Sequence, residues 1–121
     1  MLAIVMVASL LSSTEAPKAI EGVASYYTVA SSSEITASGE PFEDDELTCA
    51  MLHGEFGTYY RVTAANGESV IVRLNDRGPY VKGRLIDLSE AAIRELHPEA
   101  GLIRVKIEPI DLRALAALGG D

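Results

Sequence analysis

The dipeptide Asn66-Gly67 constrains the fold most, because it stands between two short segments rich in β-branched and aromatic residues. Tyr60–Thr63 precedes it and Ser69–Leu74 follows it. Both central positions of a type I′ turn need a positive φ angle, which Asn and Gly tolerate well, and such turns join antiparallel strands. The two segments are therefore predicted to form a β-hairpin with a type I′ turn.

Other short segments also read as strands. Residues 23–29 are rich in Tyr, Val and small residues, a composition typical of strands. Near the end of the chain, Ile103, Val105 and Ile107 alternate with charged residues, so one face can be buried while the other is hydrated. Together with the hairpin, these segments predict a mainly β, barrel-like domain.

One helix is predicted between the hairpin and the last strand. Residues 88–96 combine helix-forming residues with apolar side chains at helical spacing. Asp87 is the expected N-cap, and Glu90 three residues later would complete a capping box. Pro98 disfavours helical geometry at His97, so the helix is expected to end there.

Length, charge and cysteine content exclude several classes of protein. The 121 residues suffice for one domain with a modest core. The formal net charge of -8 has the wrong sign for a nucleic-acid partner. Cys49 is the sole cysteine, which excludes an intramolecular disulfide and paired-thiol metal sites, and it is expected to be a small buried residue. No metal or other cofactor is implied, and a monomer is the default expectation.

The N-terminus resembles a leader. The apolar run Leu2–Leu11 is too short to span a bilayer but suits a signal-peptide core, and cleavage after Ala16 would fit the small-residue rule. The alternative is a buried first strand. We therefore expect a leader in residues 1–19, a barrel domain in residues 20–110 and a tail in residues 111–121. Export to the periplasm, the cell envelope or the medium is expected, with no transmembrane span and no lipid-anchor cysteine.

Five ordered blocks carry a family resemblance. They are Gly22–Tyr27, Thr36–Glu40, Phe56–Thr58, Asn75–Pro79 and Gly83–Ser89. In this order they resemble the rare lipoprotein A (RlpA)-like proteins, from about residue 22 to residue 110. The resemblance implies a six-stranded double-psi β-barrel with one short helix, the fold shared with expansins, barwin-like proteins and certain lytic transglycosylases.

The resemblance also implies an activity. Active family members resemble peptidoglycan lytic transglycosylases, which cut the MurNAc–GlcNAc bond without water and leave a 1,6-anhydro end. Asp76 matches the acidic position of the family and is the expected catalytic acid and base, although Asp76–Pro79 alone would read as a turn. Glu40 matches the second acidic position and is expected to be catalytic as well, supporting Asp76 by holding the sugar or sharing the proton work. The alternative is a solvated carboxylate in an acidic segment.

Further residues are expected to contact the glycan strand. Arg77 would bind a carboxylate or be a structural partner within the barrel, and Tyr80 would offer a ring face to a sugar. Glu43 replaces the Asp usual in the family, and His53 stands two residues beyond the position where relatives commonly have His. That position is Met51, and a thioether cannot transfer a proton. The alternative function is therefore a non-catalytic, expansin-like module that binds or loosens the cell wall; a barwin-like inhibitor is less favoured.

Overall fold

The computed structural model describes residues 19–27, 35–99 and 101–113. It contains six strands and a short helix. The strands are β1 (Ile20–Tyr27), β2 (Thr48–Ala50), β3 (Tyr59–Ala64), β4 (Ser69–Asp76), β5 (Arg84–Ser89) and β6 (Ile103–Ile110), and the helix is α2 (Glu90–Leu96). Almost all of the predicted leader and most of the predicted tail lie outside the described residues.

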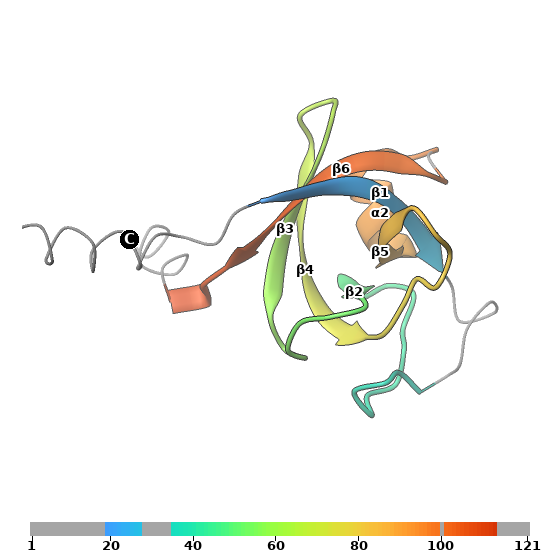
Figure 1. Ribbon diagram of the computed structural model, residues 1–121, viewed down its shortest axis with the longest axis vertical. Helices are drawn as coiled ribbons and strands as arrows, with labels where there is room; N and C mark the ends of the chain where they lie inside the picture. The colour runs from blue at the N-terminus through green and yellow to red at the C-terminus, as the bar shows by residue number, and fades with distance from the viewer. Residues whose placement is uncertain (1–18, 28–34, 100, 114–121) are drawn as a thin grey trace, which may run out of the picture.

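The six strands close into a barrel in the order β1-β5-β2-β4-β3-β6 (Figure 1). The pairs β1–β5 and β2–β4 are parallel, whereas the other neighbouring pairs are antiparallel. Closure leaves no free sheet edge in the barrel. The expected six-stranded barrel with a short helix is therefore confirmed.

The hairpin of β3 and β4 forms as predicted, but its turn is of another kind. Gly67 N donates to Ala64 O at 3.0 Å, and Ala64 N donates to Glu68 O at 2.9 Å. Gly67 has a φ angle of 92°, whereas no described non-glycine residue has a positive φ. The loop is thus a turn followed by a glycine bulge, and the predicted type I′ turn is wrong. Asn66 instead uses its side chain, which donates to Leu96 O at 3.0 Å.

The helix begins two residues later than predicted. Strand β5 continues to Ser89, and the Ser89 side chain accepts from Ala92 N as the N-cap. Asp87 lies inside β5, so its predicted role as N-cap is wrong. The strand continues because Leu88 pairs with both β1 and β2. The end of the helix at His97 is as predicted.

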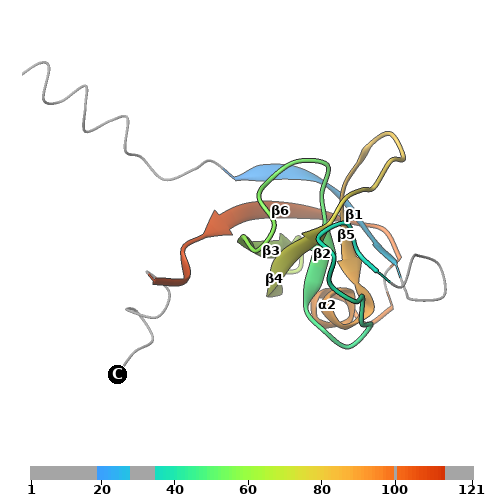
Figure 2. The same cartoon turned by 90° about the horizontal axis from the view of Figure 1, so that it is seen from below.

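The core lies inside the barrel and beneath α2. It is built from fully buried aliphatic side chains of the strands, together with Ala92, Ile93 and Leu96 of the helix. Cys49 is buried among them with a free thiol, as expected. The connection between β4 and β5, residues 77–83, projects from this body as a separate loop (Figure 2). Within the described ranges, no helix has the length and apolar character that a membrane crossing requires.

Candidate active site

Four residues form a row across four neighbouring strands. Asp87 on β5 is the register partner of Ser25 on β1 and of Ala50 on β2, and Ala50 is in turn the partner of Asp76 on β4. Residues that face each other across paired strands share one side of the sheet. The row therefore places two carboxylates on one surface, separated only by the small side chain of Ala50.

A register shift brings Asp76 onto this surface. In the pairing of β2 with β4, Cys49 faces Leu74 but Ala50 faces Asp76, so Asn75 is passed over. Strict alternation would have put Asp76 on the same side as Leu74, which is fully buried in the core. An irregularity of this kind re-aims the side chain that follows it. Asp76 consequently faces outward from the core.

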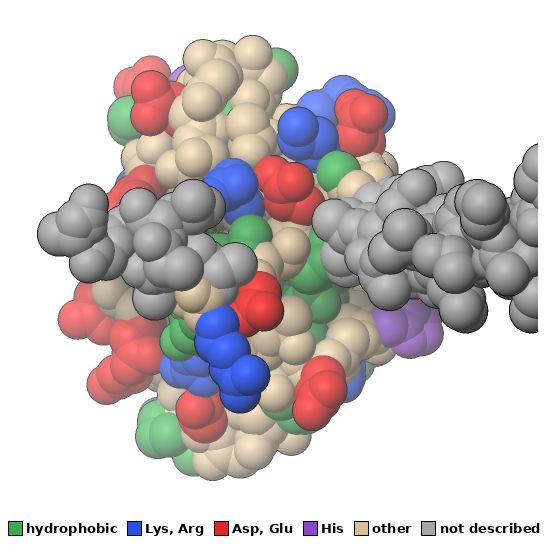
Figure 3. Space-filling view, turned by 90° about the vertical axis from the view of Figure 1, so that its left-hand side faces the viewer, with side chains coloured by type: hydrophobic (Ala, Val, Ile, Leu, Met, Phe, Trp, Pro, Cys, Tyr) green, Lys and Arg blue, Asp and Glu red, His purple; other side chains and the backbone are tan. Residues whose placement is uncertain are grey.

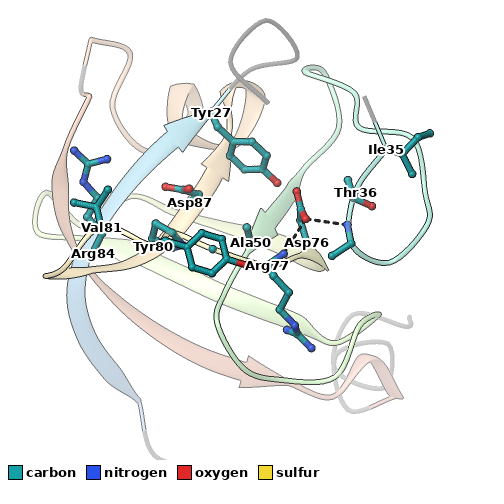
Figure 4. A pocket seen from close by; sticks show the side chains of 13 residues that line it. Tyr27, Ile35, Thr36, Ala50, Asp76, Arg77, Tyr80, Val81, Arg84 and Asp87 are labelled. Carbon is teal, nitrogen blue, oxygen red and sulfur yellow. Dashed lines mark hydrogen bonds between the residues drawn. The ribbon is translucent and has the colours of Figure 1, made fainter. Parts of the chain in front are cut away.

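Above the row lies an open cavity of about 530 Å³ (Figure 4). This volume is within the range of sites that bind small organic ligands. The cavity is bounded by the end of β1, the segment around Thr36 and the connection between β4 and β5. Its lining includes Tyr27, Thr36, Ala50, Asp76, Tyr80 and Asp87.

Asp76 is held by main-chain donors. It is the last residue of β4, and its Oδ1 accepts from Ala37 N at 2.9 Å and from Arg77 N at 2.8 Å. The bond from Arg77 comes from the next residue in the chain. The bond to Ala37 joins β4 to a segment 39 residues away. These two bonds fix the Asp76 carboxylate in the lining of the cavity.

Asp87 is the second carboxylate of the cavity, and the sequence had suggested only a helix cap for it. Its Oδ1 accepts a hydrogen bond from the Ser25 hydroxyl. Burial raises the pKa of Asp87 above its usual range; the bond from Ser25 and the charge of Arg84 oppose this rise, and the charge of Asp76 adds to it. An aspartate placed within the apolar run Leu85–Leu88 was the signal available in the sequence.

Tyr27 reaches into the cavity from the end of β1. Its ring stacks on Phe42 at a centroid distance of 4.5 Å and an interplanar angle of 9°. Its hydroxyl is buried and has no hydrogen-bond partner among the described residues, and Figure 4 shows it directed toward Asp76. Burial, followed by the charge of Asp76, raises the pKa of Tyr27 well above its usual range. The phenol therefore remains a neutral donor facing the cavity.

Arg77 and Tyr80 both line the cavity, but in different ways. The Arg77 guanidinium donates to Met51 O at 3.3 Å and to Gly54 O at 2.7 Å, and it lies 4.2 Å from the Phe56 ring centroid. It is thus engaged in holding the segment 51–57. Tyr80 is 80% exposed at the rim. Its ring is available to a ligand.

The remaining predicted residues lie outside this cavity. Glu40 and Glu43 line a separate, smaller hollow with Arg73. Arg73 Nη1 donates to both carboxylate oxygens of Glu40, which lowers the pKa of Glu40. His53 is exposed in the segment 51–57, and the Met51 side chain is 8% exposed as part of the core.

Charges of both signs lie on the described surface. Figure 3 shows acidic and basic side chains interspersed on the face it presents, without a continuous basic area among the atoms described there. In the described segments, no three His, Cys, Asp or Glu side chains are grouped so as to hold a metal ion.

Comparison with known proteins gives consistent matches. Residues 19–107 match the family described as lytic transglycolase. The chain is 46% identical over 92 residues to the endolytic peptidoglycan transglycosylase RlpA of Pseudomonas aeruginosa strain UCBPP-PA14, covering 74% of this chain and 27% of that protein. It is 40% identical over 100 residues to the protein of that name from Escherichia coli K12, covering 82% and 27%. The chain thus spans about a quarter of the length of these curated relatives.

Solved structures share the barrel. A Streptomyces papain inhibitor superposes with a TM-score of 0.66 and 22% identity, covering 79% of this chain and 97% of that one. The apo form of a Clavibacter michiganensis expansin superposes with a TM-score of 0.62 and 25% identity, covering 78% and 51%. The same barrel thus occurs in proteins whose names denote quite different activities.

Proposed function

The chain belongs to the lytic transglycolase family, and from this premise we propose that it cleaves the MurNAc–GlcNAc bond of peptidoglycan glycan strands and leaves 1,6-anhydro-MurNAc ends. The observation that carries the proposal is the Asp76 carboxylate, fixed by two main-chain amides inside an open cavity. A rigidly held carboxylate beside a groove is what proton transfer at a glycosidic bond requires.

The simplest scheme uses Asp76 for proton transfer throughout. A carboxylic acid protonates the glycosidic oxygen, and the resulting carboxylate takes the proton from the C6 hydroxyl of the same sugar, so that no water is consumed. Tyr80 contacts a sugar ring at the rim. Glu40 supports the site indirectly, because it ties the segment that carries Ala37 to β4 through Arg73. No cofactor takes part in this scheme.

The proposed substrate determines where the protein acts. Peptidoglycan lies outside the cytoplasmic membrane, so the protein is exported, with residues 1–19 serving as its leader and residues 20–110 as the working domain. It acts as a monomer on the glycan strand. Its acidic surface gives no long-range attraction to a polymer that carries carboxylates, so binding depends on contacts within the cavity.

One observation favours the second candidate function, a non-catalytic module that binds or loosens the wall. The family pattern has His where this chain has Met51, and the Met51 side chain lies in the core and not in the cavity. A thioether at this position cannot transfer a proton. A binding module would use the same cavity without breaking a bond.

Product analysis separates the two functions. The purified chain is incubated with peptidoglycan sacculi, both intact and stripped of stem peptides, and released material is examined for 1,6-anhydro ends by mass spectrometry. The expected result is anhydro product, lost in Asp76→Asn. Binding without any product would leave the wall-binding function and reject catalysis, and a reducing-end product would indicate hydrolysis instead.

A further inference from the structure

We infer that Asp87 is a second catalytic carboxyl of this site, which donates the proton to the glycosidic oxygen while Asp76 accepts the proton of the C6 hydroxyl. The inference deepens the proposed function and rests on it. It replaces the single-carboxyl scheme by a division of work between two residues. The row of register partners across β5, β2 and β4 is the geometry that supports it.

The two carboxylates are suitably separated to address two atoms of one sugar. Two strand spacings lie between β5 and β4, which places the backbones of Asp87 and Asp76 about 10 Å apart, and the side chains stand on the same surface. Ala50 between them is 2% exposed and adds a single methyl group. A ring lying over Ala50 would therefore have one carboxyl group on each side.

The surroundings of Asp87 suit a proton donor. The Ser25 hydroxyl donates to Oδ1, and no described residue donates to Oδ2. Oδ2 lies next to Gly78, at 3.9 Å from where a Cβ on that glycine would be. Burial raises the pKa of Asp87 above its usual range, which is the direction that a proton donor needs. One oxygen is thus anchored, and the other remains available to a ligand.

Asp76 has the complementary arrangement. Its Oδ1 accepts from two amide N–H groups, so main-chain donors orient the carboxylate. The buried Tyr27 hydroxyl has no partner in the described part of the chain and points toward Asp76 in Figure 4, so it can donate to a sugar oxygen bound there. Donors and acceptors on the cavity floor therefore match a hydroxylated ring.

The step balances without a co-reactant. The Asp87 proton passes to the glycosidic oxygen as its bond to C1 breaks, and the GlcNAc portion leaves with a free hydroxyl. The C6 oxygen forms a bond to C1, and its proton passes to Asp76. Proton exchange with solvent then restores protonated Asp87 and ionised Asp76, and no water is incorporated.

The pH dependence of kcat/KM on peptide-stripped glycan tests the inference. The Ser25 hydroxyl bonds to Asp87, and the titratable or charged groups that line the cavity with Asp87 are Tyr27, Asp76, Arg77, Tyr80 and Arg84. Since a proton donor must be protonated, activity falls as pH rises through its pKa. Ser25 and Arg84 both lower that pKa. Ser25→Ala and Arg84→Gln should therefore move the descending limb of the profile to higher pH.

Asp87→Asn should lower kcat/KM by about 100-fold or more, the usual contribution of general acid catalysis, with a near-ultraviolet circular dichroism spectrum like that of the parent. The inference is overturned if Asp87→Asn stays within about threefold of the parent while Asp76→Asn is inactive. It is equally overturned if Ser25→Ala and Arg84→Gln leave the descending limb in place. If the inference alone is wrong, the parent chain still forms anhydro product. If the proposed function is wrong, the parent chain forms none.

Discussion

Arg73 donates from one guanidinium nitrogen to both carboxylate oxygens of Glu40, at 2.7 and 2.9 Å. This pair lies beside the Asp76 cavity and not within it. Asn75 adds a bond to Glu40 Oε1 at 3.2 Å. Glu40 thus connects its own segment to β4.

Glu40→Gln should lower the free energy of unfolding at pH 7 by about 0.5–1 kcal/mol, a modest value because the pair is partly exposed. The hydrogen bond from Arg73 lowers the pKa of Glu40 below its usual range. Its stabilisation is therefore complete above the unfolded pKa of about 4.3 and is lost as pH falls through the lower folded pKa. Urea unfolding at a series of pH values should show a difference from the parent that is largest at pH 7 and shrinks as the pH falls below about 4.3.

Glu43→Gln is the matched control for Glu40→Gln. Glu43 is exposed, and its hydrogen bond to Glu46 raises its pKa instead of lowering it. No loss of stability at pH 7 is expected from this variant. Equal destabilisation by both substitutions, or a Glu40→Gln effect that does not shrink as the pH falls, would contradict an ion pair with Arg73 as the cause.

Met51→His should not create a catalytic histidine. The Met51 side chain is 8% exposed and packs in the core, so an imidazole there would be a polar group in an apolar site. We expect a loss of about 1–3 kcal/mol in unfolding free energy and no gain in anhydro product. Leu52→His is the control, because Leu52 is 46% exposed and should tolerate the change. Higher product yield with Met51→His would show that this position does reach the substrate.

Arg77→Lys should loosen the segment 51–57. The guanidinium bonds to two carbonyl oxygens and covers Phe56, which the single ammonium of lysine cannot reproduce. We expect a loss of about 1–2 kcal/mol and faster amide hydrogen exchange confined to this segment. Arg61→Lys, at an exposed ion pair with Glu108, should change neither quantity appreciably. Unchanged exchange in Arg77→Lys would favour a direct role in ligand binding.

The barrel could be anticipated from local patterns and ordered motifs, but two of its strands could not. β2 has only three residues, Thr48–Ala50, all buried, and so shows no alternation of apolar and polar positions. β5 joins the helix without a break, because the same residue, Ser89, is both the last residue of the strand and the N-cap of α2. Local propensity cannot separate the two elements there, and it therefore predicts Asp87 as the helix cap although Asp87 lies in the strand.

The part of the candidate site that lies within one sequence motif could be predicted, whereas the part that strand pairing brings together could not. Asp76, Arg77 and Tyr80 follow one another closely in sequence and all line the cavity. Asp87 joins them only through β2, which pairs with both β4 and β5. The register shift that passes over Asn75 is likewise a property of paired strands. Such relationships cannot be inferred from one segment alone.

Gly54→Ala should destabilise far more than Gly57→Ala. Both residues have positive φ angles, 107° and 95°, so both substitutions carry a conformational cost of about 1–2 kcal/mol. A Cβ at Gly54 would also lie 2.8 Å from the Tyr60 hydroxyl and 2.9 Å from Leu74 Cδ2, whereas one at Gly57 meets nothing within 4 Å. Crowding adds about 1–3 kcal/mol. Equal melting temperatures for the two variants would disprove the close approach at Gly54.

Tyr80→Ala should weaken glycan binding without affecting the fold. Tyr80 is 80% exposed at the rim of the cavity, so the folded protein gains little from its ring. Covering one face of the ring with a sugar is worth about 1–1.5 kcal/mol, roughly five- to tenfold in affinity. We expect KM for peptide-stripped glycan to rise by that factor, with kcat and the melting temperature close to those of the parent. Lys82→Ala, in the same exposed loop but outside the cavity lining, should leave KM unchanged. A fall in kcat at constant KM in Tyr80→Ala would instead place the ring at the reacting bond.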